Sequence, residues 1–144
     1  MDMKRVVIGT IVGFVVFEVL TYLVFDVAFG DYYAANAGMS GVLKEPNLQW
    51  AIAVTNFAGA LLVTLGIEAR SAASPASGFV IGGLIGLLVW IQGDFYYYAA
   101  TNAFQFAIAI VDPLLSALVT GVGGAVIAAT LARVPRATGL QPAR

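Results

Sequence analysis

Polar and apolar residues occur in long separate blocks along the chain. Four mainly apolar stretches cover residues 6–29, 48–67, 78–98 and 113–134. A helix needs about 20 mainly apolar residues to cross a bilayer, and each stretch is long enough. Backbone groups in lipid must be hydrogen-bonded within the segment, and the strands of a barrel would be shorter and would alternate in polarity. The pattern therefore predicts four transmembrane helices.

The composition agrees with this prediction. Of the 144 residues, 60% are hydrophobic and 10% are charged, whereas soluble domains carry roughly 25% charged residues. We predict an all-α fold: a polytopic membrane protein whose single domain, residues 1–134, is a bundle of four transmembrane helices. Residues 135–144 are polar and include two prolines, which predicts a disordered cytoplasmic tail.

The segments between the apolar stretches differ in character. Residues 30–47 are rich in Gly, Asn and Tyr and predict a long outer loop, whereas residues 71–77 predict a short polar turn. Residues 99–111 are too apolar for a free loop and too short to cross the membrane. We expect them either to lie at the membrane interface or to extend the third or fourth helix.

Basic residues predict the orientation. All but one of the Lys and Arg residues fall on the same side of the four spans, namely Lys4, Arg5, Arg70, Arg133, Arg136 and Arg144. Lys44 falls on the opposite side. Because cytoplasmic loops carry an excess of Lys and Arg, both termini are predicted to be cytoplasmic, in a multi-pass protein of the inner (plasma) membrane. An even number of spans agrees with this orientation.

The composition also excludes several kinds of chemistry. The net charge of -1 argues against nucleic-acid binding, which needs a concentrated basic face. The chain contains no Cys and no His, which removes thiolate metal sites, most transition-metal sites and haem ligation by imidazole. No metal site is predicted, and the sequence assigns no cofactor.

An acidic residue lies near the middle of the first span. Glu18 is a candidate functional residue because an ionised carboxylate at that depth costs at least a few kcal/mol. With no Lys or Arg expected inside any span, Glu18 must be protonated, hydrogen-bonded by Tyr or Asn, or facing a cavity that holds water or a cation. In an α-helix Glu18, Tyr22 and Asp26 share one face, at i, i+4 and i+8.

Polar residues of the other spans fall at comparable depth, in the outer half of the bundle. Together they predict an outward-facing polar and aromatic cavity. Its candidate ligand-binding residues are Glu18, Tyr22, Asn56, Trp90, Asp94 and Asp112.

Each of these residues also has a structural interpretation. Glu18 could make a hydrogen bond between helices, and Asp94 could mark the headgroup boundary. Asp112 followed by Pro113 is typical of a helix N-cap with Pro at the first helical position. The aromatic residues near the membrane surface, Trp50 and the run at 95–98, are typical of an interfacial belt.

Glycines inside the spans predict close helix packing. Gly82 and Gly86 form a GxxxG pair in the third span, and Gly121, Gly123 and Gly124 lie in the fourth. Small residues let membrane helices approach closely, so we predict tight pairing of the third and fourth spans in their inner halves. The same faces could instead form a homodimer interface. In either case the bundle would be closed at the cytoplasmic side and looser outside.

Three short stretches carry a family resemblance: residues 31–36 (DYYAAN), 45–46 (EP) and 111–114 (VDPL). In these the chain resembles a family of small bacterial integral membrane proteins with four predicted transmembrane helices. The resemblance implies the four-helix topology and no established activity, so it implies no catalytic residue. The position of Glu18 is also similar to that of a Glu in the first span of small multidrug transporters, which have four spans. The other spans and the longer outer loop of this chain differ from theirs.

Two functions fit these features. The first is a binding or transport protein whose cavity takes a cation, a proton or a small lipophilic ligand. The second is a non-catalytic structural or accessory subunit of a larger membrane complex. An enzyme is not predicted, because no nucleophile elbow, metal-spaced cluster or phosphate loop is present. The predicted partners are the lipid bilayer and either further copies of the chain or a larger membrane complex.

Overall fold

The computed structural model describes residues 1–38, 44 and 46–136. Within them the fold is all-helical. The elements are α1 (Met3–Thr21), the π-helix η1 (Tyr22–Ala28), α2 (Gly30–Asn36), α3 (Gln49–Ala69), α4 (Pro75–Ala100) and α5 (Phe106–Leu131). Four segments are long and apolar enough to cross a membrane: α1 continued by η1, α3, α4 and α5. The prediction of four helices long and apolar enough to cross a membrane is thereby confirmed. The predicted disordered tail lies outside the described residues beyond Arg136.

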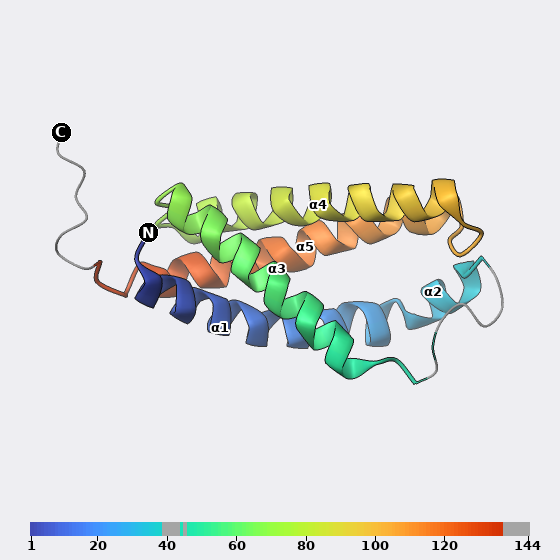
Figure 1. The fold of residues 1–144 in the computed structure, drawn as a ribbon, viewed down its shortest axis with the longest axis horizontal. Coiled ribbons are helices and arrows are strands. Elements are labelled where there is room, and N and C mark those ends of the chain that lie inside the picture. The colour runs from blue at the N-terminus through green and yellow to red at the C-terminus, as the bar shows by residue number, and fades with distance from the viewer. Residues whose placement is uncertain (39–43, 45, 137–144) are drawn as a thin grey trace.

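The helices form an elongated bundle with two distinct ends (Figure 1). The N-terminus, the turn between α3 and α4, and the last residues of α5 lie together at one end, which we call the Arg5 end. The opposite end holds α2 and the turn between α4 and α5, and we call it the Tyr33 end. It corresponds to the half that the sequence analysis treats as outer.

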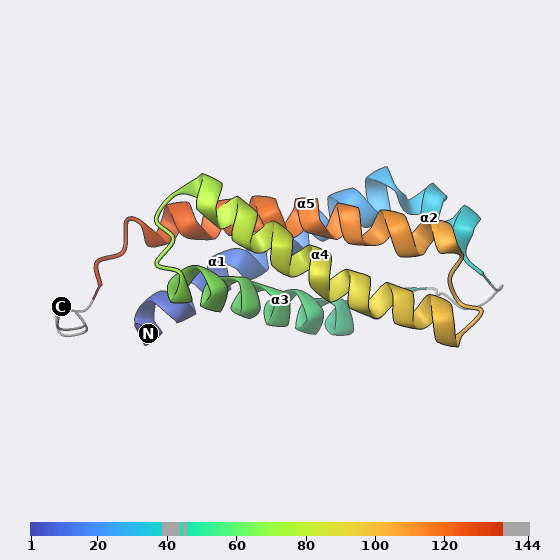
Figure 2. The ribbon, with the colours of Figure 1, turned by 90° about the horizontal axis from the view of Figure 1, so that it is seen from above.

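Helices α4 and α5 lie side by side along their length (Figures 1 and 2). Glycines on α4 make this possible. A Cβ atom at Gly78 would overlap the carbonyl of Gly124, and one at Gly82 would overlap the carbonyl of Thr120. At Gly86 it would overlap the hydroxyl of Thr120. The predicted tight pairing of the third and fourth spans is therefore confirmed, and it rests on backbone contact that only glycine permits.

A second small-residue face, on α1, is not part of the sequence prediction. A Cβ at Gly9 would lie 2.6 Å from Cγ2 of Thr64, and one at Gly13 would lie 2.6 Å from Cδ1 of Ile127. Farther along α1, the ring of Phe17 occupies the space above Gly123 of α5. Helix α1 is thereby held against α3 and α5 in the half nearer the Arg5 end.

The connections differ from one of the sequence expectations and agree with another. Helix α2 forms within the segment expected to be a loop. Helices α4 and α5 both extend into residues 99–111, which confirms the expected extension and leaves a turn at residues 101–105. At the Tyr33 end the Gly38 N–H donates to the Ala103 carbonyl at 3.0 Å, so the segment after α2 is bonded to this turn.

The N-cap interpretation of Asp112 is wrong. Helix α5 begins at Phe106 after the N-cap residue Gln105, so Asp112 and Pro113 both lie inside it. The preceding residues 106–111 are mainly apolar, and backbone in lipid satisfies its polar groups best by continuing the helix. This change places Asp112 in the body of the bundle, where it is 7% exposed.

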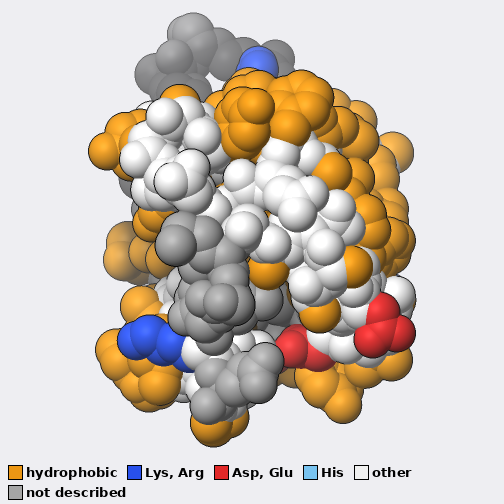
Figure 3. Space-filling model, turned by 90° about the vertical axis from the view of Figure 1, so that its right-hand side faces the viewer, with side chains coloured by type: hydrophobic (Ala, Val, Ile, Leu, Met, Phe, Trp, Pro, Cys, Tyr) orange, Lys and Arg blue, Asp and Glu red, His pale blue; other side chains and the backbone are white. Residues whose placement is uncertain are grey.

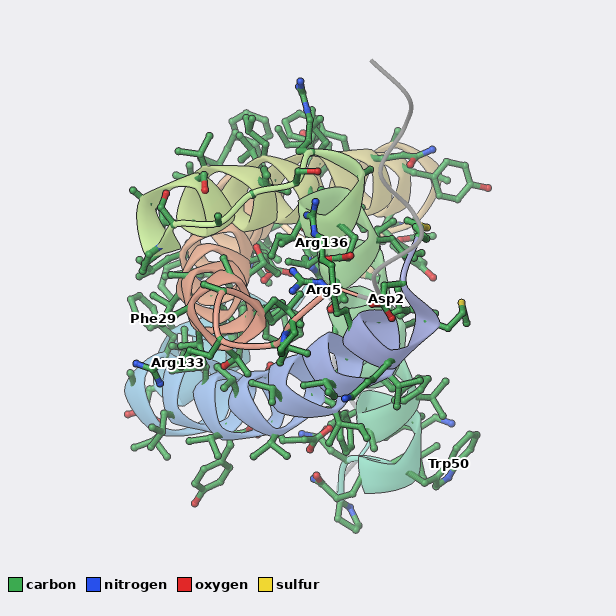
Figure 4. All side chains as sticks on the ribbon, turned by 90° about the vertical axis from the view of Figure 1, so that its left-hand side faces the viewer. Asp2, Arg5, Phe29, Trp50, Arg133 and Arg136 are labelled. Carbon is green, nitrogen blue, oxygen red and sulfur yellow. The ribbon has the colours of Figure 1, made fainter. Side chains whose placement is uncertain are left out.

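The Arg5 end is closed by a buried ion pair between Arg5, which is labelled in Figure 4, and Glu68. Arg5 lies within α1 and is 5% exposed, which corrects the expectation that no basic residue lies inside a span. Its guanidinium donates to Oε1 of Glu68 at 2.8 and 3.0 Å and to the Leu131 carbonyl at 2.6 Å, and it also contacts the Val134 carbonyl. One side chain therefore joins α1, the end of α3 and the end of α5.

Candidate functional site

A cavity of about 730 Å³ lies within the bundle, toward the Tyr33 end. Figure 1 shows why space opens there: α3 crosses the bundle and diverges from α4 and α5 toward that end. Side chains from α1, η1, α2, α3, α4 and α5 all contribute to its wall. The predicted asymmetry, with close packing in one half and a cavity in the other, is therefore present in the fold.

Most of the cavity wall is apolar and aromatic. Phe17 and Phe25 line it from the first span, and Val89 and Trp90 line it from α4. Phe104, in the turn between α4 and α5, lines it near the Tyr33 end. Such a surface favours an apolar molecule over a hydrated ion, because apolar walls offer water and ions nothing to replace their hydrogen bonds.

Two buried acidic residues meet beside this wall. Asp112 of α5 lines the cavity, and the side chain of Asp94 on α4, which is 2% exposed, lies next to it. The hydroxyl of Tyr33 donates to Oδ1 of Asp112 at 2.8 Å. Because α4 and α5 pack so closely, residues from two helices and from α2 converge at one point.

The surroundings keep Tyr33 a hydrogen-bond donor. Burial raises the pKa of its hydroxyl far above the ordinary value, and the neighbouring Asp112 raises it further. The ring of Tyr33 also packs against Phe25, with ring centroids 5.7 Å apart. Tyr33 therefore stays protonated throughout the neutral pH range and holds the carboxyl group of Asp112 in place.

Two buried polar atoms at or near the acidic pair have no hydrogen-bond partner in the described part of the chain. Ser116, one helical turn after Asp112, lines the cavity and is 2% exposed, and its hydroxyl oxygen has no hydrogen-bond partner. Oδ2 of Asp94 is buried and unpaired in the same way. Buried polar atoms without partners are rare, and each leaves hydrogen-bonding capacity for another molecule.

A second polar cluster joins α1 and α3 on another part of the wall. Nδ2 of Asn56 donates to Oε1 of Glu18 at 3.1 Å, and the Thr21 hydroxyl donates to Oδ1 of Asn56 at 3.3 Å. Thr21 and Asn56 line the cavity, whereas Glu18 is reached only through Asn56. The structure thus gives Glu18 the hydrogen bond between helices that the sequence analysis names as its structural interpretation.

The predicted site residues are placed as follows. Asn56, Trp90 and Asp112 line the cavity, and Asp94 adjoins it through Asp112. Tyr22 is 61% exposed and is not among the lining residues. The Tyr22 N–H still donates to the Glu18 carbonyl in an α-helical i→i−4 bond, so Tyr22 shares the face of Glu18, which does not line the cavity either.

Sequence reasoning did not assign Tyr33 and Ser116 to the site. Ser116 has a visible signal, because it follows Asp112 at i+4 and so shares its helix face. Tyr33 has none, because its position depends on how α2 folds back over α5. Among the described residues, no group of three or more acidic, His or Cys side chains is arranged to hold a metal ion.

Comparison with protein-family models, with curated proteins and with solved structures gives no match to this chain. The family resemblance of residues 31–36, 45–46 and 111–114 stays a prediction.

Proposed function

We propose that the protein binds a small, mainly apolar molecule that carries a cationic group, in the cavity at its Tyr33 end. The observation that supports this most strongly is the composition of the wall: aromatic and aliphatic side chains surround a buried carboxyl group, that of Asp112, which is backed by a second one. Binding would take place within the membrane, so a ligand that partitions into lipid could reach the cavity.

The size and lining of the cavity suit a small organic molecule. Ligand sites in proteins typically enclose roughly 300–1,000 Å³ and combine apolar walls with a few polar groups. The volume of about 730 Å³ falls within that range. The polar groups sit on two parts of the wall, around Asp112 and around Asn56, so they could orient a ligand rather than only hold it.

The charge of the site favours a cation. Asp112 lines the cavity, and no Lys or Arg does so among the described residues. The rings of Trp90, Phe104 and Tyr33 also face the same space, and aromatic faces attract ammonium groups. An anion would meet uncompensated negative charge in a poorly solvated place, which is costly.

The proposal includes an orientation. With Arg70, Arg133 and Arg136 at or near the Arg5 end, the positive-inside tendency puts that end and both termini in the cytoplasm. The cavity would then belong to the outer half of the bilayer of the plasma membrane, and ligands would reach it from the outer leaflet.

Tryptophan fluorescence tests where the ligand binds. The chain has two Trp residues, Trp90 in the cavity wall and Trp50, which is 70% exposed. In the W50F variant Trp90 is the single reporter, and a brominated adamantylamine should quench it saturably, because bromine quenches on contact. The matched W90F variant, which keeps Trp50, should show only weak, non-saturable quenching.

Two results would overturn the proposal. Saturable quenching of Trp50 but not of Trp90 would place the ligand on the surface. Quenching of Trp90 that rises linearly with the probe, as for partition into the detergent or lipid, would mean that the cavity holds no specific site.

A further inference from the structure

We infer that the Asp94–Asp112 pair exchanges a proton for the cationic group of the ligand, so that one proton leaves the site for each cation bound. This inference rests on the proposed function, since it requires a cation to enter the cavity. It assigns the coupling to the pair on α4 and α5, not to Glu18 of α1.

The contact between the two carboxyl groups requires a proton. An ionised carboxylate only accepts hydrogen bonds, so two of them can be hydrogen-bonded to each other only if one carries a hydrogen. Asp94 and Asp112 are buried next to each other at 2% and 7% exposure. Tyr33 donates to Oδ1 of Asp112, whereas Oδ2 of Asp94 has no hydrogen-bond partner among the described residues. The pair therefore holds at least one proton when no cation is present, as paired carboxyl groups at close range generally do.

A one-for-one exchange conserves the charge of the site. The pair with one shared proton has a charge of about −1, and the fully ionised pair with a bound ammonium group has the same charge. An ammonium group brings its own donors to the carboxylate oxygens and replaces the shared proton. The O–H bond of the protonated carboxyl group then breaks, and the proton goes to solvent. The exchange avoids adding or removing net charge in a buried place, which would be costly.

Further hydrogen-bonding capacity is present at the site. Oδ2 of Asp94 and the hydroxyl of Ser116 are buried and unpaired. Ser116 lines the cavity on the same helix face as Asp112, so its hydroxyl can accept a hydrogen bond from an ammonium group held there. These unpaired atoms are the observation that distinguishes the pair from an acidic cluster with a purely structural role.

Few other titratable groups face the pair in the described residues. Helix α2 contributes Tyr33, with Tyr32 beside it, and η1 contributes Asp26, which lines the cavity but is exposed. The lining residues of α3, among them Thr55 and Asn56, do not titrate. Proton release at neutral pH should therefore come from the pair, because Tyr33 stays protonated there.

Calorimetry in two buffers measures the exchange. Titration of the purified protein with 1-adamantylamine near pH 7, in phosphate and in Tris, gives the number of protons released per amine bound, since the two buffers differ in ionisation enthalpy. We expect about one proton per amine for the wild type. For Asp94→Asn the number of protons released per amine bound should fall to almost none, because the single remaining carboxylate has no shared proton to give up.

Glu18→Gln is the matched control. It also removes one intramembrane carboxyl group, but one that does not line the cavity, so proton release should stay at about one per amine. Infrared spectra of the wild type give a measurement that needs no variant: the band of a protonated carboxyl group should disappear when the amine is added and persist with 1-adamantanol.

The outcomes separate the two proposals. Amine binding by the wild type without proton release, or with the same release in Asp94→Asn, would overturn the exchange and leave the proposed function standing. Loss of proton release in Glu18→Gln, with release unchanged in Asp94→Asn, would mean that Glu18 of α1 releases the proton, and would overturn this inference. Failure of the wild type to bind the amine would overturn both.

Discussion

The two ends of the bundle hold their charged residues in opposite ways. At the Arg5 end, Arg5 and Glu68 neutralise each other, and the guanidinium also binds carbonyl groups at the end of α5. At the Tyr33 end, Asp94 and Asp112 have the same charge sign and meet beside a cavity (Figure 3 views the protein from this end). A neutral network needs no further molecule, whereas an acidic pair requires a proton or a cation. The ion-pair network at the Arg5 end therefore serves stability, and the acidic pair at the Tyr33 end is the part that we assign to the proposed function.

The largest expected effect comes from the Arg5 end. Arg5→Leu leaves the carboxyl group of Glu68 buried without its partner, and breaking a buried pair in this way costs about 3–5 kcal/mol. The double variant with Glu68→Leu should recover most of that loss, because no charge is left unpaired. Unfolding in mixed detergent micelles measures both. A loss below about 1 kcal/mol for the single variant, typical of exposed pairs, would contradict the role of this network.

Glycine packing between α4 and α5 should give the next largest effect. Gly82→Ala places a methyl group against the Thr120 carbonyl and should lower the free energy of unfolding by about 1–3 kcal/mol. Gly93 is on the same helix with nothing within 4 Å of its built Cβ. Gly93→Ala should therefore be neutral or stabilise by up to about 1 kcal/mol. Equal effects of the two variants would show that close approach does not limit the packing.

The hydrogen bond from Tyr33 to Asp112 should contribute a smaller amount. Tyr33→Phe removes the donor and should cost about 1 kcal/mol of stability. In a double-mutant cycle with Asp112→Asn, the two changes should be coupled by a similar energy, about 0.5–1.5 kcal/mol. Additive effects in the same unfolding assay would mean that the two side chains do not interact in the membrane.

The smallest effect should come from Tyr22. Because its side chain is 61% exposed and outside the cavity wall, Tyr22→Phe should change stability by no more than about 0.5 kcal/mol. Its affinity for 1-adamantylamine should equal that of the wild type. A clear loss of affinity would instead support the sequence hypothesis that Tyr22 contacts the ligand.

The sequence predicts the helices well because length and hydropathy decide them. The pairing of α4 with α5 was also predictable, since Gly82 and Gly86 share one helix face at i and i+4 and allow another helix to approach closely. The same glycine spacing at Gly9 and Gly13 of α1 carried an equal signal. In each case a local pattern determines a contact along one helix face.

The arrangement of the site was less predictable because it depends on contacts between distant residues. Arg5 and Glu68 are far apart in the chain, and neither gives a local sign of its partner. The Asp112–Pro113 pair is typical of a helix start, yet the apolar residues before it continue α5 upstream. Glu18 attracted the prediction because it is deepest in the first span, whereas the structure gives that carboxyl group to Asn56 and leaves Asp112 facing the cavity.

The most direct test compares a cationic ligand with a neutral one of the same shape. The affinities of 1-adamantylamine and 1-adamantanol for the wild type, measured by equilibrium dialysis near pH 7, should differ at least about tenfold in favour of the amine, equivalent to about 1.4 kcal/mol. The difference should disappear when Asp94 and Asp112 are both replaced by Asn. Equal affinities in the wild type would contradict a cation-binding cavity.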